Sequence, residues 1–193
     1  MNETGKKTGP VSNRATYRHG NVRADAVDAA CRMVAREGHE KLSLRQVATE
    51  LGIAHRSLYN HFADRDALLD AVATEAFKKL AARLKRAATS ADFTRIYARY
   101  ALKNRHIYGL MTSRPHATMK EKPELQAAVH LVISEAMRVS APAEGGSGLR
   151  RRAVMRDFIL IHGGLSLFAA GILDLPGEGA LIDELSAMVA ARE

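Results

Sequence analysis

The sequence from Ser43 to Phe62 reads SLRQVATELGIAHRSLYNHF, and it carries the clearest structural signal in the chain. Ser43 followed by Gln46 is the pattern of a capping box, in which the serine hydroxyl accepts from a backbone N–H and the glutamine reaches back. The helix that begins there ends at Gly52, and Ala48 supplies a small side chain where a second helix can cross closely. Two short helices joined by such a turn predict a helix-turn-helix motif, whose second helix enters the major groove of DNA.

The second helix of this motif is expected from about His55 to Phe62, with Ile53 and Leu58 as the apolar residues that hold the angle between the helices. Its outer side chains are hydrogen-bonding types, which can read base edges or hold phosphates. An isolated Ala-x3-Gly spacing is weak evidence, but here the capping box, the spacing and the polar outer face agree. The candidates for DNA contact on this helix are His55, Arg56, Ser57, Asn60 and His61.

Helical patterns extend on both sides of the motif. Apolar residues recur at steps of three and four from Val22 to Val34, after Asn21 as a plausible N-cap, and Asp64 is expected to cap a long helix. The chain has no sustained period-two alternation and no Asn-Gly or Asp-Gly hairpin turn, so strands are not expected. The prediction is an all-α fold in three parts. They are a flexible basic arm over residues 1–16, a helix-turn-helix domain over 17–66 and a helical C-terminal domain over 67–193.

Composition narrows the class of protein. The 193 residues include 29 Lys and Arg against 21 Asp and Glu, a formal net charge of +8 that favours a polyanionic partner such as nucleic acid. The single cysteine, Cys31, excludes an internal disulfide and a thiolate-cage zinc site. No apolar run approaches the roughly 18 residues of a membrane span, and the polar N-terminus has no signal-peptide core. A reduced, cytoplasmic protein is therefore expected.

The last third of the chain carries an a/d pattern. From Val154 to Ile172, apolar residues step by 4, 3, 4, 3 and 4, and further apolar residues cover other faces. A helix that is apolar on most sides must be buried on most sides, so a subunit interface is favoured, with an ordinary internal core as the alternative. The predicted homodimer interface comprises Val154, Ile161, Leu165, Phe168, Ile172, Leu181, Leu185 and Met188.

Residues 17–69 resemble the DNA-binding domain of the TetR family of transcriptional regulators. In the C-terminal part, Ile161-His162-Gly163-Gly164-Leu165 resembles the His-Gly signature of the WHG subgroup of that family. The segments that carry the resemblance in the DNA-binding part are YRHGNVR at 17–23, SLRQVA at 43–48, LYNHF at 58–62 and ADRDALL at 63–69.

The resemblance implies a homodimer that binds a pseudo-palindromic operator in double-stranded DNA, and a small effector that alters this binding, most often by releasing a repressor. By position, Ser43 and Tyr59 would contact phosphate, and Arg65 would lie near the DNA backbone where the family usually has Lys. Ala54 stands where a Ser or Thr often caps the recognition helix, so that cap is expected to be weak or absent. The full set of DNA-contact candidates is Arg18, Ser43, Leu44, Arg45, His55, Arg56, Ser57, Tyr59, Asn60, His61 and Arg65.

Arg18 belongs to the N-terminal basic arm, which either enters the minor groove or remains a solvated tail. In the C-terminal domain, tyrosine hydroxyls among apolar residues suit a largely apolar effector with a few polar groups. His162 is either a hydrogen-bonded core histidine or a ligand contact. The predicted ligand-binding residues are Phe93, Tyr97, Tyr100, Tyr108, Met111, Phe158 and His162.

Two other functions remain open at this point: an architectural DNA-binding protein without an effector, and a basic helical enzyme. The enzyme is disfavoured because the sequence has no Gly-rich phosphate loop, nucleophile elbow or acid pair. Its eight histidines lack the spacing of a metal site. We therefore expect no catalytic residues, no metal and no cofactor.

Overall fold

The computed structural model describes residues 21–114, 116–140 and 147–191. Within these ranges every regular element is a helix, which confirms the all-α prediction. No helix in the same ranges is both long enough and apolar enough to cross a membrane. The helices are α1 Val22–Glu37, α2 Leu44–Leu51, α3 His55–Tyr59, α4 Arg65–Leu84, α5 Ser90–Lys103, α6 Arg105–Thr112, the 3-10 helix η1 His116–Glu121, α7 Pro123–Ser140, α8 Ser147–Ala169 and α9 Glu178–Ala190.

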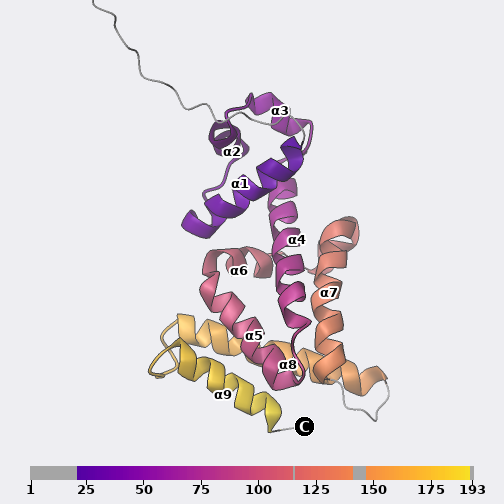
Figure 1. Cartoon of the computed structure of the whole chain (residues 1–193), viewed down its shortest axis with the longest axis vertical. Helices are drawn as coiled ribbons and strands as arrows, with labels where there is room; N and C mark the ends of the chain where they lie inside the picture. Colours follow the sequence, from indigo (N-terminus) through magenta and orange to yellow (C-terminus); the bar gives the residue numbers. More distant parts are fainter. Residues whose placement is uncertain (1–20, 115, 141–146, 192–193) are drawn as a thin grey trace, which may run out of the picture.

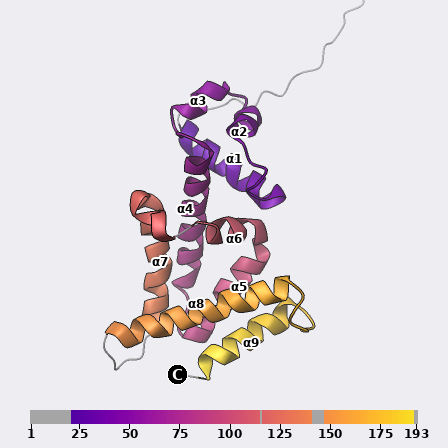
Figure 2. The same ribbon diagram turned by 180° about the vertical axis from the view of Figure 1, so that it is seen from behind.

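The molecule is elongated, with α1, α2 and α3 at one end and α8 and α9 at the other (Figure 1). Helix α4 leads out of the first group and packs along α7, while α5 packs along α9. The view from behind shows α8 crossing beneath the lower ends of α4 and α7 (Figure 2). With 20 residues, α4 is about 30 Å long, so one helix joins the two ends.

Local sequence signals set the helix boundaries. The Asn21 side chain accepts from Ala24 N at 3.2 Å, and Asp64 Oδ1 accepts from Ala67 N at 2.7 Å, so both expected caps are confirmed. The region expected as one or two helices over 93–111 divides at Asn104 into α5 and α6. Helix α3 ends at Tyr59, earlier than the sequence pattern indicated, because the chain turns there toward α4.

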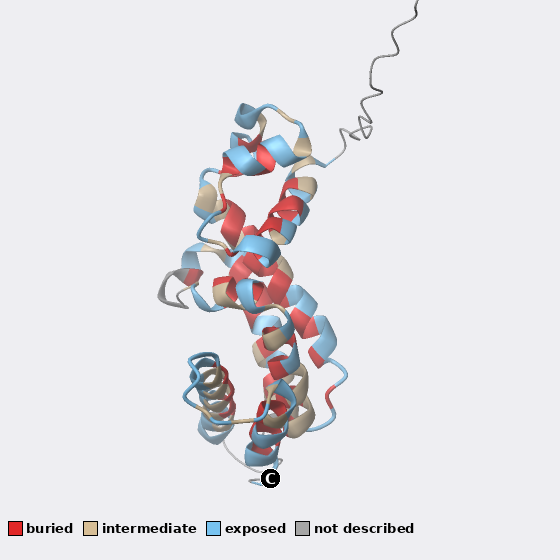
Figure 3. Ribbon diagram, turned by 90° about the vertical axis from the view of Figure 1, so that its left-hand side faces the viewer, coloured by how far each residue is buried: buried red, intermediate tan, exposed pale blue. Residues whose placement is uncertain are grey.

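A continuous hydrophobic core runs the length of the molecule (Figure 3). Leu58 and Leu68 are fully buried at the helix-turn-helix end, and Phe93 and Ile161 are buried at the other. Because α4 contributes side chains to both parts of this core, the two ends are packed through the same helix rather than joined by a linker.

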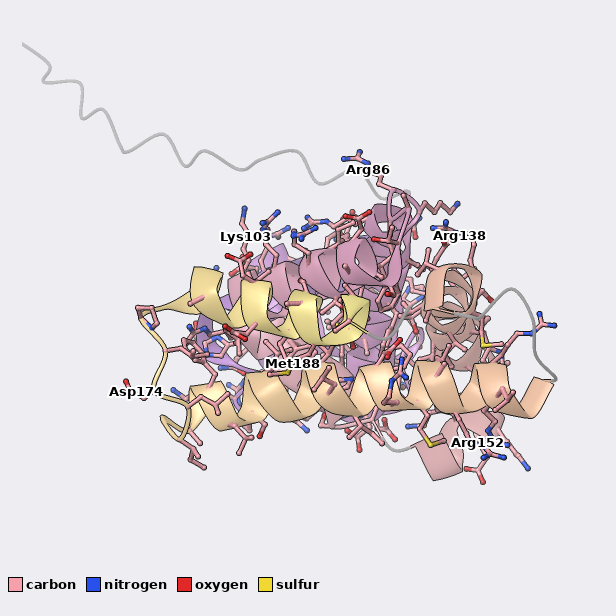
Figure 4. All side chains as sticks on the ribbon, turned by 90° about the horizontal axis from the view of Figure 1, so that it is seen from below. Arg86, Lys103, Arg138, Arg152, Asp174 and Met188 are labelled. Carbon is pink, nitrogen blue, oxygen red and sulfur yellow. The ribbon has the colours of Figure 1, made fainter. Side chains whose placement is uncertain are left out.

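Helices α8 and α9 lie side by side when seen from below (Figure 4). Gly164 makes this approach possible, because a Cβ on it would lie 2.6 Å from Leu185 Cδ2. The a/d pattern is therefore largely satisfied within the chain, which corrects the interface prediction. The predicted interface residues that are buried in the chain's own core, and so are not available to a partner, are Val154, Ile161, Leu165, Leu181 and Leu185.

The other three predicted interface residues lie nearer the surface. Phe168 is partly buried against the core, while Ile172 and Met188 are exposed. The exposed apolar face of α8 is a different one from the a/d face, and it contains Met155, Ile159 and Leu167. The spacing alone could not show which face the chain itself would cover.

Candidate DNA-binding surface and effector cavity

The turn between α2 and α3 has the geometry that the sequence predicted. Ser43 Oγ accepts from Gln46 N at 3.2 Å, which confirms the serine half of the expected capping box. The Gln46 side chain does not reach back to the backbone as expected, because its Oε1 accepts from the serine hydroxyl at 2.8 Å. Gly52 takes a left-handed conformation with φ of 66°, which favours glycine, and ends α2. Ile53 N then bonds to Ala48 O at 3.0 Å, and Leu58 is fully buried beneath the turn. These contacts fix α3 against α2.

The polar residues of α3 and its C-terminal end face outward. His55, Arg56, Tyr59 and Asn60 are exposed, Ser57 is partly buried, and His61, just beyond the helix, is exposed as well. The rings of His55 and Tyr59 meet edge to face with their centroids 5.0 Å apart, which orients the tyrosine. On α2, Arg45 is exposed, so the described part of the predicted DNA surface is basic and rich in hydrogen-bonding groups.

One of the predicted DNA contacts is not supported at its position. The Leu44 side chain is buried in the core, so it is not available to DNA; its apolar character serves packing. Ala54 precedes α3 with no side-chain hydrogen bond at that end, as its departure from the family pattern indicated. Arg18 lies outside the described residues.

Arg65 has a structural role, while its predicted contact to the DNA backbone stays a prediction. Its Nε donates to Leu42 O at 2.8 Å, and its Nη2 donates to Glu40 O at 3.2 Å and to His39 O. These three carbonyls belong to the loop between α1 and α2, so the guanidinium holds that loop against the start of α4. A lysine, with one ammonium group, could not reproduce this fork of donors.

A cavity of about 570 Å³ lies between α4, α7 and α8, with α5 and the end of α6 closing it. This volume is in the range of small-molecule sites. Of the predicted ligand-binding residues, Tyr97, Met111, Phe158 and His162 line it. The lining residues that sequence reasoning missed are Phe77, Thr112, Arg114, Val129, Val132, Ile133, Arg151, Val154, Met155 and Ile159.

The other three predicted ligand residues are not part of the lining. Phe93 is buried behind the wall, against the rings of Tyr97 and Phe158 at 5.9 and 6.0 Å. Tyr100 points toward α4, where its hydroxyl donates to Ala76 O at 3.2 Å, and burial raises its pKa to about 12. Tyr108 stacks on the imidazole of His162, with ring centroids 5.6 Å apart, and so supports a lining residue.

His162 is held by two tyrosines. Its Nε2 bonds to the Tyr97 hydroxyl at 3.3 Å and its Nδ1 to the Tyr108 hydroxyl. Burial lowers the pKa of His162, which favours the neutral ring; such a ring accepts from one hydroxyl and donates to the other. Burial likewise raises the pKa of Tyr97 and Tyr108, so both remain protonated. His162 is therefore hydrogen-bonded, and because it also lines the cavity, its contact with a ligand stays a prediction.

A cluster of ion pairs lies between the cavity and the helix-turn-helix end. Arg114, which follows α6, has its Nη1 at 3.2 Å from Asp70 Oδ1 and at 3.4 Å from Asp66 Oδ1, both on the first turns of α4. Lys122 Nζ lies at 2.7 Å from Asp70 Oδ2. Nothing in the sequence pattern marked Arg114, because it lies in a loop where no periodicity applies.

Two further contacts join α1 directly to the C-terminal helices. Arg23 pairs with Glu124 of α7 at 3.2 Å, and His106 Nδ1 of α6 lies at 3.1 Å from Ala35 O. Among the described residues, no three or more His, Cys, Asp or Glu side chains gather closely enough to hold a metal ion.

Comparison with known families identifies the first part of the chain. Residues 26–72 match the family model described as "Bacterial regulatory proteins, tetR family", and this match covers the turn whose geometry is given above. Residues 26–72 therefore have the sequence features of the DNA-binding domain of the TetR family of transcriptional regulators. TetR-family regulators are not enzymes, which supports the expectation that the protein has no catalytic activity. The model does not extend to the C-terminal helices, so the WHG subgroup remains a resemblance.

Solved structures share the fold over nearly the whole chain. A Rhodococcus sp. RHA1 protein of unknown function is 28% identical with a TM-score of 0.74, covering 92% of this chain and 98% of its own. A TetR-family transcriptional regulator from Streptomyces coelicolor is 17% identical with a TM-score of 0.64, covering 88% and 78%. A TetR regulator from Rhodococcus sp. RHA1 is 15% identical with a TM-score of 0.59, covering 86% and 93%. No curated protein sequence matches the chain.

Proposed function

We propose that this regulator binds a specific operator as a homodimer and releases it when a small, largely apolar effector occupies the cavity. One observation carries the proposal. The first half of α4 packs against α1 and carries the buried Leu68 and Leu69, while Phe77, two turns further on, lines the cavity. A ligand that displaces the wall at Phe77 therefore acts on the helix that positions the DNA-binding end.

The predicted operator contacts are those exposed at the helix-turn-helix end. We expect a pseudo-palindromic site with half-sites about one DNA turn, ~34 Å, or somewhat more apart, because each subunit presents one recognition helix. Arg56 is the foremost candidate for reading a guanine, since it is exposed on α3 and its guanidinium can bond to two acceptors on that base.

Footprinting over a salt series tests this function. Arg56→Ala should weaken binding to the preferred site by about 1–3 kcal/mol and relax the preference at one base pair. Arg99→Ala, an exposed arginine on α5, is the matched control for the loss of one charge. A protein that protects no preferred sequence would instead be an architectural DNA binder, and the proposal would be wrong.

The homodimer interface is proposed on the exposed apolar face of α8. Met155, Ile159 and Leu167 follow one ridge at spacings of four and eight residues, and their exposed fractions are 50%, 66% and 41%. Ile172 and Met188 are exposed at the same end of the molecule. Packing α8 and α9 against a second copy would make a four-helix interface and cover these side chains.

Sedimentation at micromolar concentration tests the interface. Ile159→Glu should give a folded monomer, because the side chain is exposed in the single chain but would be buried without a partner charge in the dimer. Leu131→Glu, an exposed apolar residue on α7, is the control that should remain dimeric. A dimer that survives Ile159→Glu would exclude this face.

Release by an effector makes a reciprocal prediction. If the ligand weakens operator binding by a given factor, the operator must weaken ligand binding by the same factor. Electron density in the cavity of protein purified from its host would identify the ligand, and titration into free and operator-bound protein would compare its affinities. Phe158→Ala should change ligand affinity and spare operator affinity; equal ligand affinity with and without DNA would exclude the release mechanism.

A further inference from the structure

The cavity combines apolar walls with two positive charges. Phe77, Val132 and Phe158 are typical of its walls, but Arg114 and Arg151 also line it, and no Asp or Glu of the described residues does. Arg151 is exposed, at the first turns of α8, one residue before the Arg152 labelled in Figure 4. Arg114 is deeper, with only 12% of its side chain exposed. The cavity therefore has one guanidinium at its edge and one inside, and the inner one is paired with Asp66 and Asp70, which do not line the cavity.

The hydrogen bonding of Arg114 is incomplete. A guanidinium has five N–H donors, and in Arg114 one of its nitrogens, Nη1, contacts both Asp66 and Asp70. Its Nε is buried and has no hydrogen-bond partner among the described residues. An unsatisfied buried donor is unfavourable, so the present pairing is not the best that Arg114 can achieve. This reduces the cost of exchanging its partner for another anion.

We propose that the effector is an amphipathic carboxylate, whose apolar chain lies along the cavity walls and whose carboxylate pairs with Arg114. This inference rests on the proposed function and names the chemical class of its effector. A guanidinium binds a carboxylate through two parallel hydrogen bonds, which satisfies its donors better than single contacts do. Arg151 at the edge attracts the same charge during entry.

Other ligand classes fit less well. A neutral apolar molecule that filled the cavity would remove water from Arg114 without replacing its hydrogen bonds, which is unfavourable. A cation would face the guanidinium groups of Arg114 and Arg151, and no carboxylate of the described residues lines the cavity to pair with it.

The ion pair between Arg114 and Asp70 couples effector binding to the DNA-binding end of the molecule. Arg114 joins the end of α6 to Asp70, in the second turn of α4, and α4 begins shortly after the helix-turn-helix motif. When a ligand carboxylate replaces Asp66 and Asp70 as the partner of Arg114, Asp70 keeps Lys122 as its counter-ion. Asp66 is largely exposed, so water can solvate its carboxylate. No carboxylate is left buried and unpaired, yet the tie between α6 and the DNA-binding end of α4 is lost.

Straight-chain dodecanoate, 1-dodecanol and dodecylamine are matched probes of this site, because they share the chain and differ in charge. Calorimetric titration of the full-length protein should show the acid binding at least about tenfold more tightly than the alcohol, as expected for charge-assisted hydrogen bonds. The amine should bind most weakly. An alcohol that binds as tightly as the acid, or an amine that binds more tightly, would overturn the proposal.

Two substitutions shift the preference in opposite directions. Arg114→Met should remove the preference for dodecanoate over dodecanol, whereas Arg99→Met on α5 should leave it unchanged. Asp70→Asn should strengthen dodecanoate binding several-fold without affecting dodecanol, because Arg114 then loses its main competing anion. If Arg114→Met does not fold, Asp70→Asn still decides: unchanged or weaker acid binding would contradict the role of Arg114.

Operator binding separates this inference from the proposed function. Dodecanoate should release the operator from the wild-type protein and fail to release it from Arg114→Met. If dodecanoate binds with the expected charge preference but operator affinity is unchanged, the ligand class stands and the release function is wrong. If no acid binds while another ligand releases the operator, the release function stands and the ligand class is wrong.

Discussion

The two ends of the molecule differ in how far their structure can be predicted from the local sequence. At the DNA-binding end, the turn is built from residues 43–62, and its caps, its left-handed glycine and its buried Leu58 are neighbours in the chain. The cavity takes its walls from five helices, with residues from Phe77 to His162. Contacts formed by chain neighbours leave a readable pattern in the sequence, whereas a space left between helices leaves none.

The largest expected difference between the two ends concerns stability. Leu58→Ala should lower the free energy of unfolding by about 2–5 kcal/mol, because a fully packed leucine leaves a void beneath the turn. Ile133→Ala should cost less, since Ile133 is only partly buried and already borders empty space. Urea unfolding of both variants measures the contrast. Equal losses would mean that the cavity wall is as tightly packed as the turn.

A second contrast lies within the DNA-binding end, between Arg65, which has a structural role, and Arg45, which is exposed and available to DNA. Arg65→Ala should lower stability by about 1–3 kcal/mol, because the carbonyls in the loop between α1 and α2 lose their donors. Arg45→Ala should leave stability within about 0.5 kcal/mol, since Arg45 is exposed, and should weaken operator binding instead. Thermal unfolding and operator titration together separate the roles. Unchanged stability of Arg65→Ala would exclude the structural role of Arg65.

At the opposite end, two adjacent glycines provide an internal control. Gly164→Ala should destabilise the protein by about 1–3 kcal/mol, because the new Cβ would meet Leu185 at 2.6 Å. Gly163→Ala should be neutral or stabilising by up to about 1 kcal/mol in the monomer, since nothing lies within 4 Å and alanine favours the helix. Thermal melts followed by circular dichroism compare them, and the reverse order would contradict the packing of α8 on α9.

The smallest expected effect is the pH dependence from His162. Burial lowers the pKa of His162 below its ordinary value of 6.5, so this residue's contribution is fully present above that pH. As the pH falls from 6.5, the unfolded chain takes up a proton first, and stability is lost until the folded pKa is reached. His162→Gln removes this part of the slope while other histidines remain. The free energy of unfolding, measured against pH for both proteins, should fall more steeply below pH 6.5 in the wild type. Parallel curves would exclude this contribution from His162.

The candidate sites were predictable to different extents. The exposed set on α3 and Arg45 of α2 could be found from the motif, because each position has a fixed place in a helix-turn-helix. The four predicted ligand residues that line the cavity came from aromatic and apolar positions, but the same pattern also suggested Phe93 and Tyr100, which face other helices. Periodicity indicates that a residue is inside without indicating what it faces.

Short-range chemistry controls the elements that could be predicted from the residues alone: the caps at Asn21, Ser43 and Asp64, the turn at Gly52, and the all-α class. Only the tertiary structure decided that the a/d residues of α8 belong to the chain's own core, that Arg65 holds a loop, and that Arg114 links the cavity to α4. This difference follows from the separation along the chain of the residues that make each contact. A cap or a turn is complete within about four residues, whereas burial and ion pairing depend on which distant surfaces meet, and many arrangements of the same helices satisfy the same local pattern.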